Sequence, residues 1–551
     1  SYHLTMCRLE KFLKDEGVEN QKLKMDYSIK RYPWTKLSDS EIAYCVNDVK
    51  GLRQAVIKLM QKYDDDVTTV PVTSTGYVRR ECKEVMLNGK SKLAMPDLEL
   101  LEALRNAFRG GNTHANRYNS NVTIRTEDID AEIKSRDISS SYPSVMCQEK
   151  FPMQFVKREN ADMRTIKNIL SCPCKAILAD ITLYDIEIKD GVSVPYLTVG
   201  KAIEISKLNE EDDEYEDNGR VLKRKQARYV VTEIDLEIIM KQYDCKIQVN
   251  KLWSATKKAL PDELIKLIYK HYDDKTALKG DEKRKADYDK SKTFINGIYG
   301  MSVQNPLKPH YAYDAKTNTN ILENVSNENL YEDYMKTAFL PYQVGVWVAA
   351  YGRQRLQWAI DIIPPENFIY CDTDSTKYIS EPEIEEEFEK LNSEIKEISH
   401  TAKDKKGNIH YMGIYEDETE KEQDKITAFR TLGAKKYAYV TKDGKLHVTI
   451  SGVGKNDEFD DEGKLVKMGG ATELGDIDKM QKGFIFKESA GLDKKYNDYT
   501  EKREYEIDGH KIRISSNVYL YQSTYTLGLA GDYVRMLNAL SNREIWSYFG
   551  K

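Results

Sequence analysis

The sequence has few of the features that mark membrane or secreted proteins. No run of about 18 apolar residues occurs in the 551 residues, so no membrane-spanning helix is expected. The stretch SYHLTMCRLEKF lacks the basic start and long apolar core of a signal peptide. The eight cysteines include no Cys-x-x-Cys pair, and the Cys172-x-Cys174 spacing is too tight for a usual zinc site. We therefore expect a cytoplasmic protein with reduced thiols and no membrane partner.

The chain also lacks an excess of positive charge, internal repeats and a Pro/Gly/Ser-rich linker. Its net charge is −6, yet residues 251–292 contain twelve Lys/Arg against eight Asp/Glu, and a local field matters more than the sum. Residues 210–217 (EEDDEYED) contain seven acids in eight positions, which favours a solvated loop. The length corresponds to roughly three to four modules.

Hydrophobic periodicity predicts a mixture of helices and strands without a βαβ rhythm, which indicates an α+β fold. The expected helices cover 39–63, where Asp39 or Ser40 would cap an apolar stripe running from Ile42 to Leu59, and 96–118, where Gly110 and Gly111 end the helix. Further helices are expected at 261–275, 285–300 and 345–363. A strand that leads into a helix is expected at 131–146, a half-buried strand at 176–188, and hairpins at 367–380 and 435–452.

Three groups of polar residues stand out against this background. Asp137 ends a predicted strand and is followed by Tyr142-Pro143, so it is either a hard oxygen ligand for a divalent cation or an ordinary turn residue. On the helix 285–300, the spacing of Lys292, Asn296, Tyr299 and Gly300 places them on one face. That face either binds a phosphate-bearing molecule or is ordinary packing before a glycine stop.

The third group is the hairpin NFIYCDTDSTKYIS, with Asp372 and Asp374 at its tip. Carboxylates this close repel each other and raise each other's pKa unless a cation lies between them. If Asp137 lies on a neighbouring strand, the three carboxylates can gather around two metal ions about 3.5–4 Å apart, a geometry that supports displacement at phosphorus. Other Asp-x-Asp copies, at 64, 128 and 476, are read as solvated turns.

In this order the three stretches resemble the motifs of family B DNA polymerases. DISSSYPS resembles motif A, KTFINGIYG motif B and YCDTDS motif C. FRGGNTHAN at 108–116 resembles the YxGG motif, and Lys435-Lys436-Tyr437 resembles the KxY motif, which points to the protein-primed bacteriophage branch. VTEIDLEIIMKQYD at 231–244 resembles the segment that joins palm to fingers in that branch.

The resemblance implies a right-hand polymerase with palm, fingers and thumb. The first expected part, residues 1–70, is what remains of the C-terminal portion of an exonuclease domain. The parts that follow are the first palm segment (71–150), an insertion or palm extension (151–256), fingers (257–300), a strand-displacement or processivity insertion (301–342), the second palm segment (343–445), and a thumb with the C-terminal region (446–551). It also implies primer-template DNA and dNTPs as partners, two Mg²⁺ ions for which Mn²⁺ can substitute, and a role in phage replication within a bacterial cytoplasm.

The resemblance also assigns roles to residues. Metal binding falls to Asp137, the Ile138 carbonyl and Asp374, and Asp372 is the third catalytic carboxylate. The residues that would bind the incoming nucleotide are Ser140, Ser141, Tyr142, Lys275, Lys292, Asn296 and Tyr299. The residues that would contact DNA are Phe108, Arg109, Gly110, Gly111, Gly297, Gly300, Thr373, Lys435 and Tyr437.

The sequence departs from the family pattern at three positions, without touching the carboxylates. Ser141 replaces the usual Leu beside Tyr142, Gly297 replaces the Ser of motif B, and Phe108 replaces the Tyr of YxGG. These changes affect the expected sugar selection, template contact and transfer to an exonuclease domain.

Only part of an exonuclease site is found. Tyr44-x3-Asp48 resembles the third exonuclease motif, with both side chains one helical turn apart, but acids resembling the two earlier motifs are absent from this sequence. We expect this chain alone to lack 3′→5′ exonuclease activity, with the remaining exonuclease portion as a further partner.

Three other functions compare with this one. A reverse transcriptase is disfavoured because Thr373 separates the two hairpin carboxylates, and an exonuclease-only remnant is disfavoured by the missing acids. A catalytically silent replication scaffold that holds DNA through Lys251 to Lys292 remains the alternative. A terminal protein that supplies the priming hydroxyl is a further expected partner.

Overall fold

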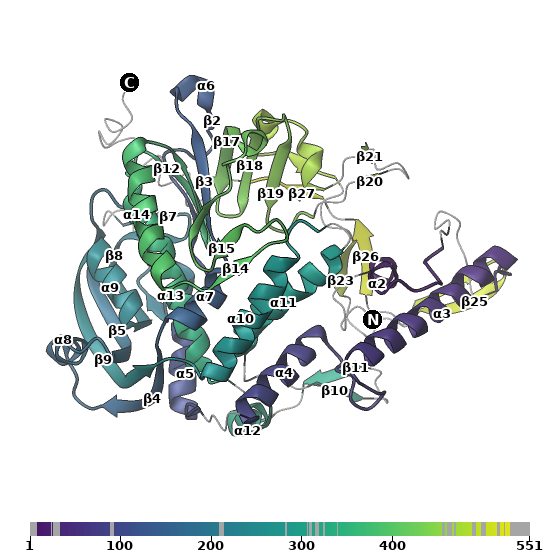
Figure 1. Cartoon of the computed structure of the whole chain (residues 1–551), viewed down its shortest axis with the longest axis horizontal. Coiled ribbons are helices and arrows are strands. Elements are labelled where there is room, and N and C mark those ends of the chain that lie inside the picture. The colour runs from purple at the N-terminus through teal and green to yellow at the C-terminus, as the bar shows by residue number, and fades with distance from the viewer. Residues whose placement is uncertain are drawn as a thin grey trace. The chain divides into compact units, whose positions relative to one another are not determined.

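The structure is a computed structural model that describes residues 8–23, 25, 34–88, 93–208, 214–281, 284–305, 307, 311–314, 319–322, 325–338, 340–454, 458–459, 465–467, 470–487, 492–496, 503–514, 518–522 and 524–528. The chain divides into two compact units. The first unit contains Ser1–Lys92, Pro261–Ser302 and Thr401–His410, and the second contains Leu93–Leu260, Val303–His400 and Tyr411–Lys551. Figure 1 traces their elements in chain order.

The first unit is mainly helical. Its helices are α2 (Leu9–Asp15), α3 (Asp39–Lys62), α4 (Ser74–Asn88), α10 (Asp262–Ala277) and α11 (Lys285–Ser302). Helices α10 and α11 pack on each other and on α4, which confirms the two lysine-rich helices expected on either side of Gly280. The backbone of Gly280 has a φ of +78°, a value that favours glycine, and it separates the two helices.

The N-cap of helix α3 lies one residue before the first of the two expected caps. Ser38, rather than Asp39 or Ser40, is the N-cap, and it forms a capping box with Glu41. The expected apolar stripe is only partly buried, because Leu59 is covered but the side chains of Ile42, Val46 and Val49 are 48%, 45% and 68% exposed. The helix instead buries small residues, Gly51 and Ala55, where α2 and the following loop approach closely.

The second unit contains a nine-stranded sheet. Seven strands follow the order β1 (Thr113–Ala115), β12 (Phe368–Asp372), β13 (Ser375–Ile379), β3 (Ile133–Ile138), β17 (Ile426–Gly433), β18 (Lys436–Thr441) and β19 (Leu446–Ile450). Strand β16 (Tyr415–Asp417) pairs with β3, and β2 (Thr123–Arg125) pairs with β17. The hairpins expected at 367–380 and 435–452 are confirmed as β12–β13 and β18–β19, with Gly444 at a φ of +81° in the second turn.

Helices pack against this sheet. They are α6 (Thr126–Ile129), α13 (Tyr342–Ile362) and α14 (Pro382–Ile398), and α13 and α14 lie side by side (Figure 1). Helix α7 (Ser141–Gln148) packs on α13, and α5 (Leu98–Ala107) packs on α13 and on two strands of a second sheet. Leu356 and Ile360 of α13 share one core with Phe368 of β12 and Phe388 of α14. The helix expected at 345–363 is therefore confirmed. The helix expected at 96–118 is confirmed only over Leu98–Ala107, because residues 113–115 form strand β1.

Residues 151–258 form a second, six-stranded antiparallel sheet. Its order is β4 (Phe151–Arg158), β9 (Tyr243–Lys258), β5 (Lys175–Ile188), β8 (Arg220–Thr232) and β6 (Glu204–Ile205), with β7 (Tyr215–Asp217) beside β8. Helices α8 (Met163–Leu170) and α9 (Glu233–Gln242) pack on this sheet. The prediction that 176–188 is half-buried is wrong, because residues 176–183 are buried without alternation by neighbouring strands and helices. Whether this sheet is a family insertion stays a prediction.

The remaining elements are smaller. They include β10 (Tyr311–Asp314) paired with β11 (Thr319–Leu322), α12 (Asn327–Thr337), and β14 (Thr401–Lys403) paired with β15 (Ile409–Tyr411). In the C-terminal region, Leu474 and Phe486 extend the core of β18 and β19. The expected thumb lies partly outside the described residues, as does the expected insertion at 301–342.

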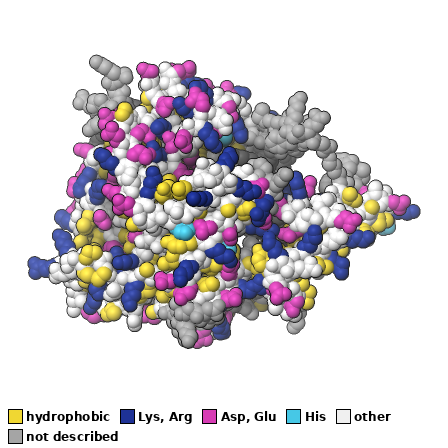
Figure 2. Space-filling view, viewed as in Figure 1, with side chains coloured by type: hydrophobic (Ala, Val, Ile, Leu, Met, Phe, Trp, Pro, Cys, Tyr) yellow, Lys and Arg dark blue, Asp and Glu magenta, His cyan; other side chains and the backbone are white. Residues whose placement is uncertain are grey.

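The visible surface carries both signs of charge. In Figure 2 the Lys/Arg and Asp/Glu side chains are interspersed over the face in view, in keeping with the small net charge of −6. Among the described residues, no helix combines the length and apolar character needed to cross a membrane.

A buried ion pair joins α13 to α9. The Arg353 guanidinium donates to Asp235 at 2.7 Å and to the Tyr196 hydroxyl at 2.8 Å, and both charged side chains are buried. Burial alone would raise the pKa of Asp235, but the positive charges of Arg353 and Arg109 hold it well below its usual range. Removing one partner would leave the other charge buried and unpaired.

We expect Arg353→Leu to lower the free energy of unfolding by about 3–5 kcal/mol, because Asp235 would lose its cation inside the core. The matched control is Lys246→Met, which breaks an ion pair with Asp185 whose side chains are 81% and 66% exposed. The control should stay within about 0.5 kcal/mol of the parent. Urea denaturation measures both, and equal effects of the two substitutions would contradict this account.

Candidate active site

Two carboxylates meet where β3 and the β12–β13 hairpin end. Strand β13 pairs with β3 so that Ser375 lies opposite Asp137, and the Ile138 N–H donates to the Asp374 carbonyl at 2.9 Å. The hairpin turn is tight, because Thr373 has a φ of +61° and the Asp374 N–H donates to the Asp372 carbonyl at 2.6 Å. Asp137 and Asp374 are consequently brought together from distant parts of the sequence.

The electrostatics of this pair are unfavourable without a cation. Burial, with the negative charges of Asp374 and Glu418, raises the pKa of Asp137 to about 8. Burial, with the charges of Asp372 and Glu418, raises the pKa of Asp374 to about 6. Half-buried carboxylates that disfavour each other's charge are typical of a site that recruits a positive ion.

Asp372 has a different environment from the other two carboxylates. One of its carboxylate oxygens accepts hydrogen bonds from the Thr113 hydroxyl at 2.9 Å and the Thr373 hydroxyl at 3.1 Å, and it forms an ion pair with the Lys435 ammonium group. Its charge is therefore already compensated by the protein. This arrangement separates a supporting role for Asp372 from the open pair formed by Asp137 and Asp374.

As the side chains stand, the three carboxylates do not form one ligand cluster. Within the described part of the chain, no group of three or more His, Cys, Asp or Glu side chains is arranged to hold a metal ion. The charge of Asp374 raises the pKa of Asp137, and the charge of Asp372 raises that of Asp374, while Asp372 itself is paired with Lys435. From the sequence we expected all three carboxylates around shared metal ions, and the division between Asp372 and the other two was not predicted.

Gly111 and the tip of the hairpin fit closely together. A Cβ at Gly111 would lie 2.6 Å from the Thr373 Cγ2 atom and 2.8 Å from its Cβ, and the Thr373 N–H donates to the Asn112 carbonyl at 2.7 Å. Only glycine leaves room for the threonine at this distance. The neighbouring Gly110 is exposed, and a Cβ there would meet nothing within 4 Å.

The first turn of α7 contributes Tyr142. Ser140 adopts a φ of +51° immediately before the helix, and its carbonyl accepts the Ser144 N–H at 2.9 Å. The ring of Tyr142 rests on α13 at Gly352, where a Cβ would lie 2.9 Å from a ring carbon. The absence of a side chain at Gly352 thus sets the position of the Tyr142 ring.

Two predicted ligand contacts need correction. The guanidinium of Arg109 is buried, with its carbon 5.2 Å from the ring centroid of Tyr229 and 5.8 Å from that of Tyr196, so it packs inside the protein instead of facing DNA. The Ser141 side chain is also buried, beneath the first turn of α7. As the structure stands, neither side chain reaches a surface that a ligand could touch. Phe108, the neighbour of Arg109, packs edge-on against Tyr342.

Lys435 and Tyr437 flank the acidic hairpin from β18. Lys435 has a φ of +58°, and its N–H donates to the Tyr370 hydroxyl at 2.9 Å, which fixes the lysine beside Asp372. The ring of Tyr437 lies 4.8 Å from that of Tyr370 and 5.8 Å from that of Phe429. The predicted KxY residues are therefore adjacent to the predicted motif C hairpin.

The other predicted residues lie in the first unit. On α11, Lys292 and Asn296 are exposed and Tyr299 is half-buried, as are Gly297 and Gly300, whereas Ile295 and Ile298 are buried. Lys275 on α10 lies 4.9 Å from the ring centroid of Tyr272. On α3, Tyr44 is buried, and Asp48 lies 3.9 Å from the Lys22 ammonium group. Their expected roles stay predictions.

The sequence did not single out Lys377 and Glu418. The buried Lys377 ammonium donates to the Ser135 hydroxyl at 3.2 Å, and that hydroxyl donates to Glu418 at 2.6 Å. Burial lowers the pKa of Lys377, an effect that Glu418 and Asp137 partly offset. No sequence signal set Lys377 apart within the strand STKYI, and Glu418 is remote from it in sequence.

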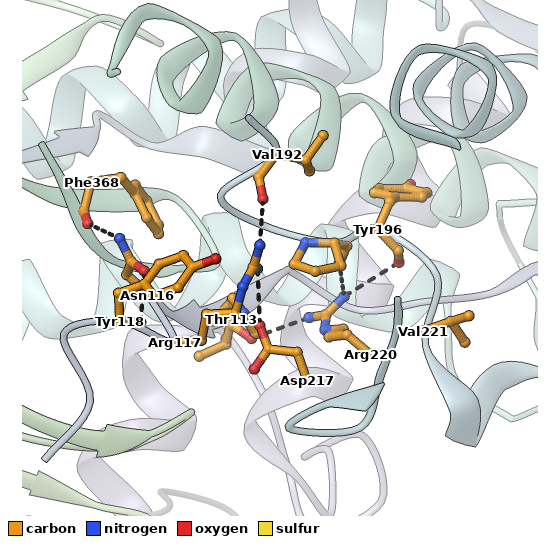
Figure 3. A network of polar contacts seen from close by, with 12 residues as sticks. Thr113, Asn116, Arg117, Tyr118, Val192, Tyr196, Asp217, Arg220, Val221 and Phe368 are labelled. Carbon is orange, nitrogen blue, oxygen red and sulfur yellow. Dashed lines mark hydrogen bonds and ion pairs between the residues drawn. The ribbon is translucent and has the colours of Figure 1, made fainter. Parts of the chain in front are cut away.

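A buried polar network lies behind β1 (Figure 3). The Asp217 carboxylate accepts from His114 at 2.9 Å and from Arg117 at 3.4 Å, and Arg117 also donates to the Val192 carbonyl at 3.4 Å. Arg220 donates to the carbonyl of Thr113, the residue that pairs with Asp372. The reading of 210–217 as a solvated loop is wrong for this end of the run, because Asp217 and Glu214 are buried by the arginines they pair with; residues 210–213 lie outside the described part.

Comparisons with known proteins agree with this geometry. Residues 6–390 match the family described as DNA polymerase type B, organellar and viral. Phi29 DNA polymerase, solved with primer-template DNA and incoming nucleotides, is similar in fold with a TM-score of 0.63 at 18% identity, over 96% of this chain and 79% of that one. Its orthorhombic crystal form gives a TM-score of 0.61 at the same identity and coverage. A search of curated proteins gave no match.

The family match and the shared fold define the class as a DNA-directed DNA polymerase with an α+β, right-hand fold. The chain belongs to the type B DNA polymerases of organelles and viruses. The resemblance to family B found in motifs A, B and C is confirmed.

We expect Gly111→Ala to destabilise the protein by about 1–3 kcal/mol, because the new methyl group would force Thr373 and the hairpin to shift. Gly110→Ala is the matched control, since a Cβ there enters open space and should change stability by less than about 0.5 kcal/mol. Thermal unfolding of both variants measures the difference. Equal melting temperatures would show that the hairpin does not depend on this close contact.

Proposed function

We propose that the chain extends a primer 3′-hydroxyl by template-directed addition of dNTPs, with Asp137 and Asp374 as the ligands of divalent ions. The observation that carries this proposal is the pair of half-buried carboxylates formed by Asp137 of β3 and Asp374 of the β12–β13 turn, whose pKa values are raised to about 8 and about 6. A protein gains no stability from such a pair alone. A cation that binds between them offsets the repulsion.

The donor set fits Mg²⁺ or Mn²⁺. Both ions prefer hard oxygen ligands, which the two carboxylates and the Ile138 carbonyl supply. When bound, two such ions activate the attacking hydroxyl and offset the charge that develops at phosphorus. The Lys435 ammonium forms an ion pair with Asp372, and its positive charge also acts on Asp374.

The remaining residues act by positioning the reactants. Thr373, fixed by Gly111 and the Asn112 carbonyl, holds the hairpin tip at which the primer end would lie, and Tyr437 packs behind it. Tyr142, held against Gly352, would exclude a ribose 2′-hydroxyl. The exposed Lys292 and Asn296 of α11 offer a cation and an amide to the triphosphate of the incoming nucleotide. Positioning and electrostatics supply the acceleration in this account.

We further propose protein-primed replication of a phage genome. The support is the YxGG-like and KxY-like motifs, together with the fold shared with phi29 DNA polymerase, whose solved complexes contain primer-template DNA. The partners of this chain would be primer-template DNA, dNTPs and a terminal protein. The 301–342 segment, and the sheet at 151–258, would then serve as branch-specific insertions.

Asp374→Asn should abolish primer extension while raising stability. With Mg²⁺ and dNTPs the wild type should extend a primer, and the variant should lose at least about 10³-fold in rate because one metal ligand is gone. The matched control Asp128→Asn, in another Asp-x-Asp pair, removes an exposed carboxylate and should retain full activity. If the wild type extends no primer with either Mg²⁺ or Mn²⁺, the silent DNA-binding scaffold is favoured instead.

The same carboxylates predict how stability depends on pH. Folding raises the pKa of Asp137 to about 8 and that of Asp374 to about 6, so the folded state binds more protons than the unfolded state. Without divalent ions, stability should therefore fall as pH rises from about 4 to 8. Mg²⁺ should raise the melting temperature more at pH 8 than at pH 5, because protons compete for its ligands at the lower pH.

In EDTA at pH 8, Asp374→Asn should be more stable than the wild type by about 1–2 kcal/mol, since one of the repelling charges is removed. The gain with Mg²⁺ should be much smaller in the variant than in the wild type. Differential scanning fluorimetry across the pH range measures both effects. A wild type whose melting temperature ignores Mg²⁺ at every pH would argue against metal binding at this pair.

Protein priming is tested by supplying a candidate terminal protein with the polymerase, one labelled dNTP and a template end. We expect label to move onto a hydroxyl of the added protein, resistant to denaturing electrophoresis and absent with Asp374→Asn. If a DNA primer is extended but no protein acceptor from the same genome is labelled, the priming proposal fails and the polymerase proposal stands.

A further inference from the structure

The turn between α8 and β5 brings two thiols together. Cys172 and Cys174 follow the end of α8 at Leu170, and their sulfur atoms lie 2.7 Å apart. A disulfide bond is about 2.0 Å long, so the two sulfurs are within about 1 Å of bonding distance. Cys174 is exposed and Cys172 is half-buried, so reagents in solution can reach this dithiol.

The backbone holds the dithiol in this geometry. The Lys175 N–H donates to the Cys172 carbonyl at 3.0 Å, and the Lys257 N–H of β9 donates to the Cys174 carbonyl at 2.7 Å. Pro173 between the two cysteines has a restricted φ, which limits the conformations that the turn can adopt. The proximity of the sulfurs is thus a property of the turn as well as of two side-chain rotamers.

The two thiols differ in acidity. A hydrogen bond from the Cys174 thiol, with the nearby positive charge of Lys175, lowers the pKa of Cys172, and the same contact raises the pKa of Cys174. Cys172 is therefore the better nucleophile at neutral pH, and Cys174 is the thiol that reacts second. The carboxylate hairpin lies on other elements and takes no part in this chemistry.

We propose that Cys172 and Cys174 form a redox-sensitive dithiol, a modification site that closes reversibly to an intrachain disulfide by exchange with a small disulfide such as glutathione disulfide. The Cys172 thiolate attacks one sulfur of glutathione disulfide, a Cys172–glutathione bond forms, and one glutathione thiolate leaves. The Cys174 thiolate then attacks the Cys172 sulfur and releases the second glutathione. The protein loses two electrons and two protons, and glutathione disulfide is reduced to two glutathione molecules.

The disulfide should be readily reversible. A ring that encloses a single residue removes little conformational freedom from the unfolded chain, so it gains little of the stabilisation that a long disulfide loop provides. Strained, exposed disulfides have higher reduction potentials and are reduced more easily. The site therefore suits a modification that follows the redox state of its surroundings, and it is independent of the proposed metal site.

The test uses the full chain, glutathione disulfide, rapid alkylation and peptide mapping by mass spectrometry without reduction. We expect the 172–174 peptide to lose two hydrogen atoms, to take up no alkylating agent and to recover both thiols after reduction. Cys172→Ser and Cys174→Ser should not form this product, and each should instead retain a glutathione adduct. Cys45, a lone exposed thiol on α3, is the internal control and should stop at the mixed disulfide.

A trivalent arsenical provides a second measurement on the unmodified sequence. Phenylarsine oxide forms two As–S bonds with a dithiol and releases one water molecule, so it should bind Cys172 and Cys174 together and protect both from alkylation. Each single serine variant should lose at least about tenfold in arsenical affinity, since one of the two bonds is lost. The proposal is overturned if glutathione disulfide leaves two separate adducts at 172 and 174, or if the arsenical binds the wild type no better than the variants.

Discussion

The pairing of β3 with β13 is the constraint on which the site depends. It places the end of β3 against the turn between β12 and β13. Two carboxylates from distant parts of the sequence, Asp137 and Asp374, are therefore half-buried close together. Burial and mutual repulsion make Asp137 and Asp374 reluctant to ionise. The surrounding residues then divide their tasks: Lys435 neutralises Asp372, while Lys377 and Glu418 form a polar layer beneath the pair. We propose that a divalent ion supplies the missing positive charge.

Two sets of contacts hold the β12–β13 hairpin in place. In the second sheet, Asp217 bonds to His114 of β1 and Arg220 bonds to the Thr113 carbonyl of β1. A carboxylate and an arginine remote from the hairpin thus hold the strand that pairs with Asp372. From the side, Gly111 admits Thr373 at a distance that no other residue would allow. Burying the Asp217 charge is unfavourable unless its partners are present, so this network favours one arrangement of the segments over alternatives. The catalytic geometry therefore draws on residues well outside the motifs.

Much of the architecture followed from sequence patterns, because periodicity and turn chemistry are local. The helices α10, α11 and α13 and both hairpins were predictable, whereas the catalytic roles of the three carboxylates stay predictions. What failed depended on tertiary partners. The alternation in 176–188 indicated one wet face, yet neighbouring strands and helices cover both faces of β5. Arg109 was expected at DNA but is buried beside Tyr229, and Asp217 was expected in water but pairs with Arg117. No local pattern distinguishes a buried charge from a solvated one when its partner lies far along the chain.

The close approach of Gly111 to Thr373 also bears on how this sequence can change over time. The two positions are remote along the chain but occupy one volume, so a larger residue at either one is tolerated only if the other retreats. While residue 373 is threonine, a side chain at position 111 has no room; a smaller residue at 373 would make that room. In relatives of this protein, the identities of these two residues should be inherited as a pair.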